Sequence, residues 1–198
     1  MQFNDMTGLA IRGHIKIHDP ETKEVFVDKG NAIHYENMSI ALAKSIADSG
    51  QGFIYEMAFG NGGTAVDPTG IITYLTPNSS GSNASLYNER YVKVVDDRSS
   101  NNTDPTRNFI ETRHVTGTNY TDVFITCLLD YGEPSGQQAY DTTTNNESAY
   151  VFDELGLKSY SPTGTGMLLT HVIFHPVQKS LNRLIQIDYT VRIQSLTG

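Results

Sequence analysis

The chain of 198 residues is poor in several residue types, and each shortage excludes a class of protein. It has no tryptophan and a single cysteine, so no internal disulfide framework can form. Charged residues make up 18% and hydrophobic residues 38% of the chain, both below the usual share in globular proteins. No apolar run approaches the roughly 18 residues of a membrane-spanning helix. The first residues, MQFNDMTGLAIRG, lack a basic region followed by an apolar core. We therefore expect no signal peptide, no membrane partner and synthesis in a reducing cytoplasm.

Basic residues are also in the minority. There are 14 lysines and arginines against 22 aspartates and glutamates, which gives a formal net charge of -8. A protein that binds nucleic acid irrespective of its sequence needs a basic surface that releases counterions. The charge disfavours that function, and we expect no sequence-specific nucleic-acid partner either.

Uncharged polar residues are abundant, namely Ser, Thr, Asn and Gly, together with 11 tyrosines. This composition is typical of a loop-rich all-β protein. Strict alternation of apolar and polar residues over 11–17 and 182–193 indicates half-buried strands. We predict one domain over residues 1–198 that is mainly β. It is expected to be a β-sandwich or barrel-like domain with one α-helix and long polar loops.

Turn-forming residues separate the predicted strands. Residues 11–17 and 24–28 predict an N-terminal hairpin with unpaired edges that are free to pair with another subunit. The other predicted strands are residues 53–59, 71–75, 89–95, 109–116, 122–130, 167–174 and 182–193, and residues 151–157 are expected to form a strand end or one turn.

One helix is expected over residues 34–48, because Met38, Leu42 and Ile46 recur at helical spacing. Asn37 is its expected N-cap and Gly50 its expected stop.

Three polar loops are predicted at residues 76–85, 96–107 and 131–148, and residues 159–166 are expected to be flexible. Loops longer than about 12–15 residues in a compact domain are usually functional or disordered. Ordering the backbone costs about 1–2 kcal/mol per residue. We therefore predict that these loops, of which 96–107 is expected to be mobile, become ordered against neighbouring proteins.

A glycine-rich run, FGNGGT at residues 59–64, invites comparison with a phosphate-binding loop. It lacks the Gly-Lys-Ser/Thr ending, and Asp67-Pro68 follows it instead of a helix. We interpret the run as a tight turn with several residues at positive φ. His171 and His175 are four residues apart on a predicted strand. That spacing separates them by about 13 Å, too far to share a metal ion. No metal site and no cofactor are predicted.

The sequence offers no nucleophile and no acid–base pair. There is no G-x-S-x-G elbow, and Cys127 lies in the apolar run VFITCLL, where we expect a buried core residue. The adjacent acids Asp96-Asp97 and Asp153-Glu154 point to opposite faces of a strand, and we interpret both pairs as solvated loop charges. No catalytic residue is predicted, and the chain is not expected to be an enzyme.

Three blocks carry a resemblance to a known class: GHIKIHDPETKEVFVDKGNAIHYENMSIALAKSIA, YEMAFGNGGT and LLTHVIFHPVQKSLNRLIQIDYTVRIQ. They resemble tailed-bacteriophage virion structural proteins, with the neck or collar, the tail tube, the baseplate and capsid decoration as candidate locations. The resemblance implies self-assembly into a symmetric ring or lattice within the virion. It also implies contacts with other virion proteins (portal or connector, tail or capsid) and no enzymatic activity.

The leading hypothesis is a structural component of the neck, collar or tail of a tailed phage. Two alternatives stay open: a capsid decoration protein, and a carbohydrate-binding β-sandwich of the tail tip, in which tyrosines stack on sugars. Lys179, Arg183 and Arg192 are a basic cluster that is either a contact for acidic loops or an ordinary solvated surface. The predicted interface residues are His34, Tyr35, Asn37, Asp96, Asp97, Arg98, Tyr140, His175, Lys179 and Arg183.

Overall fold

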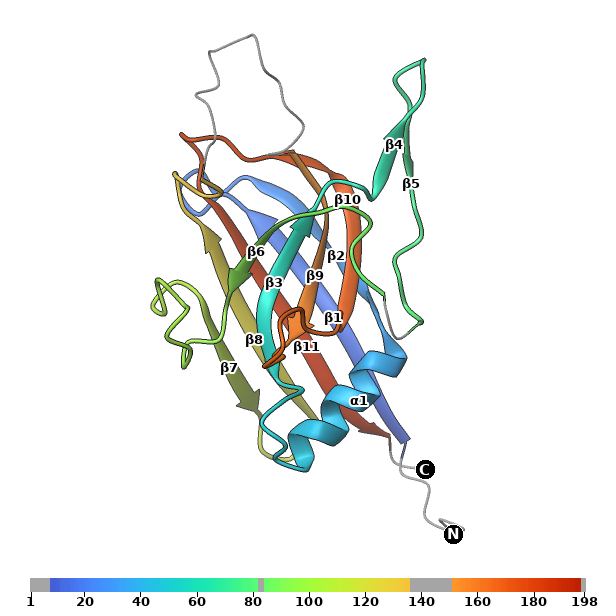
Figure 1. Cartoon of the computed structure of the whole chain (residues 1–198), viewed down its shortest axis with the longest axis vertical. Helices are drawn as coiled ribbons and strands as arrows, with labels where there is room; N and C mark the ends of the chain where they lie inside the picture. Colours follow the sequence, from blue (N-terminus) through green and yellow to red (C-terminus); the bar gives the residue numbers. More distant parts are fainter. Residues whose placement is uncertain (1–7, 82–83, 136–150, 197–198) are drawn as a thin grey trace.

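A computed structural model describes residues 8–81, 84–135 and 151–196. These residues form one helix and eleven strands (Figure 1). In chain order the elements are β1 (Gly8–His18), β2 (Val25–Ile33), α1 (Tyr35–Ile46), β3 (Ile54–Gly60), β4 (Thr64–Val66), β5 (Ile72–Tyr74), β6 (Glu89–Val94), β7 (Phe109–His114), β8 (Tyr120–Leu129), β9 (Val151–Ser159), β10 (Thr170–Gln178) and β11 (Ile185–Leu196).

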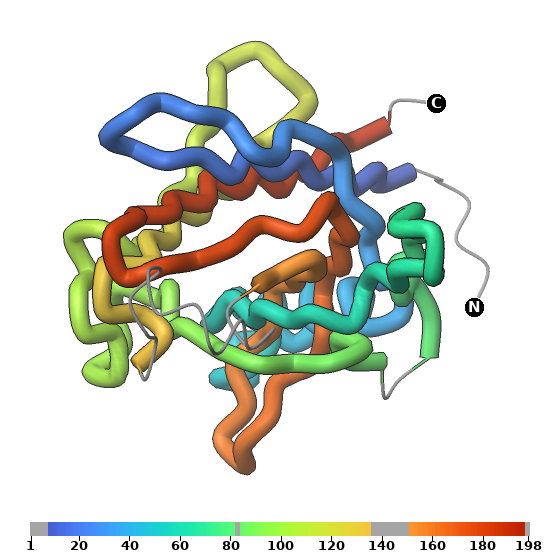
Figure 2. The backbone as a smooth tube through the Cα atoms, turned by 90° about the horizontal axis from the view of Figure 1, so that it is seen from above, coloured from blue at the N-terminus to red at the C-terminus, as the bar shows by residue number. Residues whose placement is uncertain are grey.

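Nine strands form a single antiparallel sheet in the order β6-β3-β9-β10-β2-β1-β11-β8-β7. The sheet curls into a half-barrel, with β1 and β2 on one side and β3 and β6 on the other (Figure 2). β4 and β5 pair only with each other and form a separate hairpin. The prediction of a mainly β, barrel-like fold with one helix is confirmed.

The N-terminal hairpin exists, but the prediction that its edges are free is wrong. β1 pairs with β11 over its whole length and with β2 on its other side, and β2 continues to β10. The free edges of the sheet are instead β6 and β7. The alternating pattern of residues 11–17 shows one buried face, but it does not tell which strands lie alongside.

The prediction for residues 151–157 is also wrong. These residues belong to β9, a full strand between β3 and β10 that is buried along nearly all of its length. The sequence DELGLK looks solvent-facing because it holds Asp153, Glu154 and Lys158. All three are less than 5% exposed and have hydrogen-bond partners inside the protein. Paired charges of this kind are tolerated in an interior.

Apolar residues from both sides of the curled sheet fill its interior. Ile15, Met57, Leu129, Leu155 and Ile187 are each completely buried there. Cys127 lies among them, as predicted, and burial raises the pKa of its thiol to about 12.

We expect the Cys127 thiol to be inert toward a disulfide reagent in the folded protein. A thiol with this pKa is about a thousandfold less ionised near pH 8 than the same group in an unfolded chain. Labelling by Ellman's reagent, followed at 412 nm as roughly this wavelength reports the released product, should therefore be fast in denaturant and very slow without it. Complete labelling of the native protein within minutes would contradict the assignment.

The helix α1 begins one residue after a histidine cap. His34 is the N-cap, and its Nδ1 accepts the backbone N–H of Asn37 at 3.3 Å. The prediction of Asn37 as the cap is therefore wrong. Asn37 lies within the first turn and donates its Nδ2 to the carbonyl of Leu168 at 2.9 Å. The buried face of the helix packs Met38 and Ala41 against Leu169, which holds α1 against one end of the barrel.

Polar side chains close the gap between the two ends of the sheet. Lys93 of β6 donates to the carbonyl of Leu128 on β8 at 2.8 Å and pairs with Glu133. Asn108 accepts the N–H of Leu128 at 2.9 Å, and Asn102 donates to the Asn108 carbonyl at 2.8 Å. The loop 96–107 is thus a compact series of turns packed on its own barrel, contrary to the prediction of a mobile arm.

Candidate functional site

The hairpin β4–β5 stands away from the barrel (Figure 1). Its turn, Asp67-Pro68-Thr69-Gly70, is tightly ordered. Asp67 Oδ1 accepts the N–H groups of Thr69 at 2.8 Å and Ile71 at 3.0 Å, and Gly70 adopts a φ of +86° that favours glycine. Next to this turn the side chains of Val66 and Ile71 are 64% and 61% exposed. The hairpin therefore presents apolar groups on a well-defined support.

Asp153 of β9 holds the first strand of the hairpin. Its two carboxylate oxygens accept the backbone N–H groups of Gly63 at 2.9 Å and Thr64 at 3.0 Å, and the Thr64 hydroxyl also donates to it. Since an isolated two-stranded hairpin is at best marginally stable in water, this anchor fixes the direction in which the hairpin projects.

Glu154, the next residue, is completely buried and accepts four hydrogen bonds. Its Oε1 accepts the N–H groups of Gly62 at 3.0 Å and Asn88 at 2.8 Å. Its Oε2 accepts the N–H of Tyr87 at 2.9 Å and contacts His171 Nε2 at 3.0 Å. One carboxylate thus ties together the segments before and after the hairpin and the strand β10. We call Asp153, Glu154 and His171 the acidic anchor.

The interpretation of Asp153-Glu154 as solvated charge is therefore wrong. The carboxylates lie inside the protein because backbone N–H groups from two loops surround them. Burial on its own raises the pKa of Glu154. The hydrogen bonds from His171, Asn88, Tyr87 and Gly62 outweigh it and hold that pKa below its ordinary value. Glu154 stays ionised at neutral pH, with both oxygens already bonded, which suits an anchor rather than an acid or base.

The protonation of His171 follows from its neighbours. Its Nδ1 accepts the backbone N–H of Asn78 at 2.8 Å, so Nε2 carries the proton that is donated to Glu154. The second histidine of the pair, His175, is exposed and its Nδ1 lies 3.3 Å from the hydroxyl of Tyr74 on the hairpin. The two histidines thus contact different partners. Across the described residues, no group of three or more metal-binding side chains occurs.

The glycines at 60–64 serve a different purpose from the one predicted. None of Gly60, Gly62 and Gly63 has a positive φ. A Cβ on Gly60 would lie 2.4 Å from Glu154 Oε1, and one on Gly62 would lie 2.8 Å from the Cβ of Tyr87. These glycines allow the backbone to approach the acidic anchor, which a larger residue would prevent.

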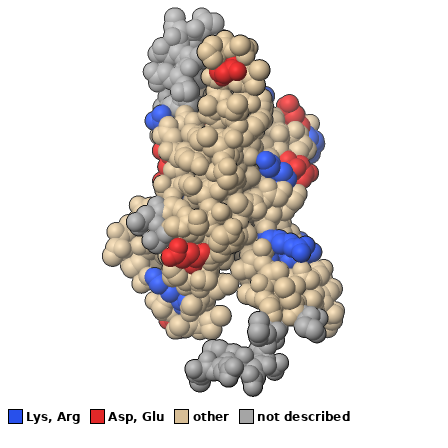
Figure 3. Space-filling view, turned by 90° about the vertical axis from the view of Figure 1, so that its right-hand side faces the viewer, with Lys and Arg blue, Asp and Glu red and all other residues tan. Residues whose placement is uncertain are grey.

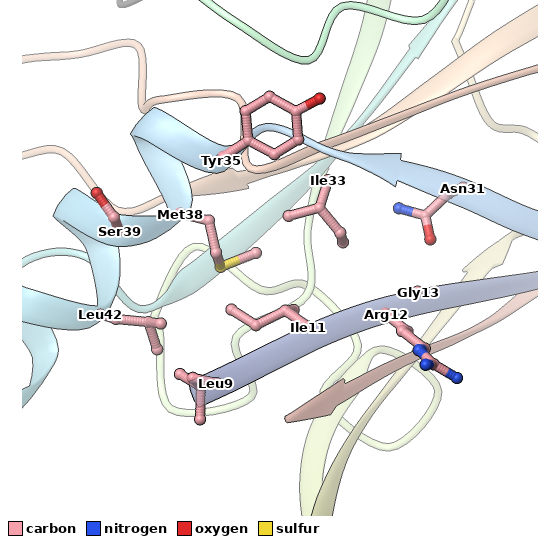
Figure 4. Close-up of a pocket in the computed structure, with 10 residues that line it drawn as sticks. All are labelled: Leu9, Ile11, Arg12, Gly13, Asn31, Ile33, Tyr35, Met38, Ser39 and Leu42. Atoms are coloured by element: carbon pink, nitrogen blue, oxygen red, sulfur yellow. The ribbon is translucent and has the colours of Figure 1, made fainter. Parts of the chain in front are cut away.

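A second surface feature is an apolar groove between α1 and the strands β1 and β2, with a volume of about 680 Å³ (Figure 4). Ile11, Ile33, Met38 and Leu42 converge on one end of it, with Leu9 and Tyr35 at the rim. Asn31, Gly13 and Arg12 lie toward the other end (Figure 4). The groove is thus apolar at one end and polar at the other.

The ten predicted interface residues are dispersed over the structure. Tyr35, Asp97, Arg98 and His175 are exposed, Arg183 is half-buried, His34, Asn37, Asp96 and Lys179 are buried, and Tyr140 lies outside the described residues. Of the exposed ones, Tyr35 lines the groove and His175 contacts the hairpin. The buried Lys179 donates to the Ser180 carbonyl at 2.9 Å, and burial lowers its pKa to about 8.

The predicted basic cluster is partly occupied within the chain. Arg192 forms two hydrogen bonds of 2.7 Å with the carboxylate of Asp122, and Arg183 lies over the ring of Phe26. The predicted loop 131–148 falls largely outside the described residues.

Sequence reasoning missed β4, and with it the hairpin. The signal is present as Thr64-Ala65-Val66 and Ile72-Thr73-Tyr74 on either side of Asp-Pro-Thr-Gly, a common turn sequence. We interpreted Asp67-Pro68 only as an argument against a phosphate-binding loop.

Comparison of the chain with protein-family models, with curated proteins and with solved structures finds no match. The helix found in the described part of the chain is too short and too polar to cross a membrane.

Proposed function

We propose that the chain is a structural subunit of a tailed-bacteriophage virion, located in the neck, collar or tail and assembled through subunit–subunit contacts. The observation that carries the assembly function is the projecting hairpin, whose apolar side chains are exposed while its base is fixed by the buried acidic anchor. The resemblance of the sequence supports the phage origin. The proposal assigns no catalytic step to the chain.

An anchored hairpin favours binding to a protein partner for an energetic reason. Exposed Val66 and Ile71 gain about 25 cal/mol for each Å² of apolar surface that a partner covers. The turn at Asp67 and the contacts of Asp153 already order the backbone, so little further conformational entropy is lost on binding. A solvated loop without such anchors would lose that entropy at the moment of contact.

Sedimentation velocity of the full chain over a range of concentrations tests the assembly. We expect the wild type to form discrete oligomers, and we expect Val66→Lys to weaken association at least about tenfold, because the lysine charge would have to be desolvated at the contact. Val115→Lys is the matched control: Val115 is 59% exposed in the turn between β7 and β8, and its replacement should leave association unchanged.

Mass spectrometry of purified particles from the phage that encodes the chain tests the location. We expect the chain in the tail or neck fraction. Its presence on heads alone would favour a decoration protein instead. A chain that stays monomeric at every concentration and is missing from the particles would contradict the proposal.

A further inference from the structure

Two apolar surfaces of the molecule lie at opposite ends of its long axis. The hairpin is at one end, and the groove beside α1 is at the other (Figure 1). Leu9 and Tyr35 at the groove rim are 55% and 68% exposed, comparable to Val66 and Ile71 on the hairpin. A single copy cannot bring these two surfaces together, so any contact between them needs a second copy.

We propose that the hairpin β4–β5 of one copy docks into the α1 groove of a second copy. This inference rests on the proposed function, because it specifies the contact by which the subunits assemble. Val66 and Ile71 of the hairpin would cover the apolar end of the groove formed by Ile11, Met38 and Leu42.

Charge complementarity favours this occupant. The turn of the hairpin carries the exposed carboxylate of Asp67, whose pKa is lowered by hydrogen bonds from the Thr69 side chain and the Ile71 backbone. The polar end of the groove carries the exposed guanidinium of Arg12, which has no ion-pair partner among the described residues. Figure 3 shows acidic atoms at the upper end of this face and basic atoms further down, with mostly uncharged surface between them.

The symmetry of such a contact also agrees with an assembly protein. A contact between two different surfaces of the same chain is heterologous, so each copy keeps one free hairpin and one free groove after pairing. The chain can therefore add copies until a ring closes or a filament forms. A contact between two identical surfaces would end at a dimer.

Cross-linking between two engineered cysteines tests the contact directly. Pro68→Cys places a thiol on the turn of the hairpin, and Ser39→Cys places one on the exposed side of α1 beside the groove. The buried Cys127 stays in place. We expect a mixture of the two single variants, treated with a short bismaleimide, to give the mixed dimer at least about tenfold above the control pair. The control pair is Pro162→Cys with Ser39→Cys, since Pro162 is exposed in the turn after the opposite end of β9.

A second variant measures the groove without cysteines. Tyr35→Glu adds a negative charge where Asp67 is expected to arrive. It should weaken association at least about tenfold in sedimentation. Ile46→Glu adds the same charge on the same helix, at a residue that is 85% exposed and does not line the groove, and it should leave association unchanged. Circular dichroism of both variants checks that the fold is retained.

The outcomes separate this inference from the proposed function. Oligomers that form without a preference for the Pro68→Cys and Ser39→Cys pair, and that tolerate Tyr35→Glu, would overturn the docking and leave self-assembly standing. Cross-links between two Pro68→Cys copies alone would show a symmetric contact of hairpins and overturn it too. A wild type that is monomeric at all concentrations would contradict both.

Discussion

Glu154→Gln should cost the protein about 3 to 5 kcal/mol of its free energy of unfolding. The substitution keeps the shape of the side chain but replaces one carboxylate oxygen by an NH₂ group. Each oxygen of Glu154 accepts two hydrogen bonds, so in either orientation two buried donors would face another donor. An unsatisfied buried donor costs about 1–3 kcal/mol. Urea denaturation followed by circular dichroism measures the loss.

The control for this prediction is Glu36→Gln, an exposed glutamate in the first turn of α1. It should change the free energy of unfolding by less than about 0.5 kcal/mol. Equal effects of the two substitutions would show that Glu154 is not an anchor.

The pH dependence gives the same carboxylate a second readout. Because the pKa of Glu154 in the folded protein lies below its ordinary value of 4.5, its ionised form stabilises the fold above that pH. This stabilisation is lost as the pH falls below 4.5 toward the folded-state pKa. The difference in stability between the wild type and Glu154→Gln should therefore be full at pH 7 and shrink in acid. A difference that grows in acid would contradict the assigned direction.

Gly60→Ala is expected to have the second largest effect, about 3 kcal/mol. Its Cβ would lie 2.4 Å from Glu154 Oε1 and 2.7 Å from the carbonyl oxygen of Asn88. Neither atom can move without breaking the hydrogen bonds of the acidic anchor. Overpacking of a tight interior usually costs about 1–3 kcal/mol, and the lost hydrogen bonds add to it. Thermal and urea unfolding measure the change.

Gly132→Ala serves as the control, because nothing lies within 4 Å of the added Cβ and the φ of Gly132 is not positive. That variant should be as stable as the wild type or slightly more stable. Hydrogen exchange at the amides of residues 62–64 should speed up in Gly60→Ala only. Unchanged exchange there would separate the hairpin from its anchor.

The sequence predicts the apolar strands well and the polar ones poorly. The alternation of residues 11–17 and 182–193 reports one buried face, and β1 and β11 occur there. β9 was missed because its two carboxylates and Lys158 look solvated until their partners are known. Those partners, such as the N–H groups of Gly62 and Tyr87, come from segments distant in the chain. No local pattern reports them.

The candidate site was out of reach for the same reason. Its apolar side chains are few, and a three-residue strand such as β4 is too short to show periodicity. The helix cap was misassigned because asparagine is the more usual cap, whereas His34 uses a ring nitrogen for that purpose. Tyr35 and His175 were predicted as surface residues and are exposed, but their connection to the groove and to the hairpin depends on the tertiary structure.

The pairing of Gly8 with Leu196 places the first and last described residues side by side, at the same end of two neighbouring antiparallel strands. A force that pulls these two residues apart would break the hydrogen bonds between β1 and β11 one after another, as a zip opens. A force applied between the hairpin and the groove would instead run along the length of the strands and load many hydrogen bonds at once. The barrel is therefore mechanically weak at its termini and strong along the axis that joins its two apolar surfaces.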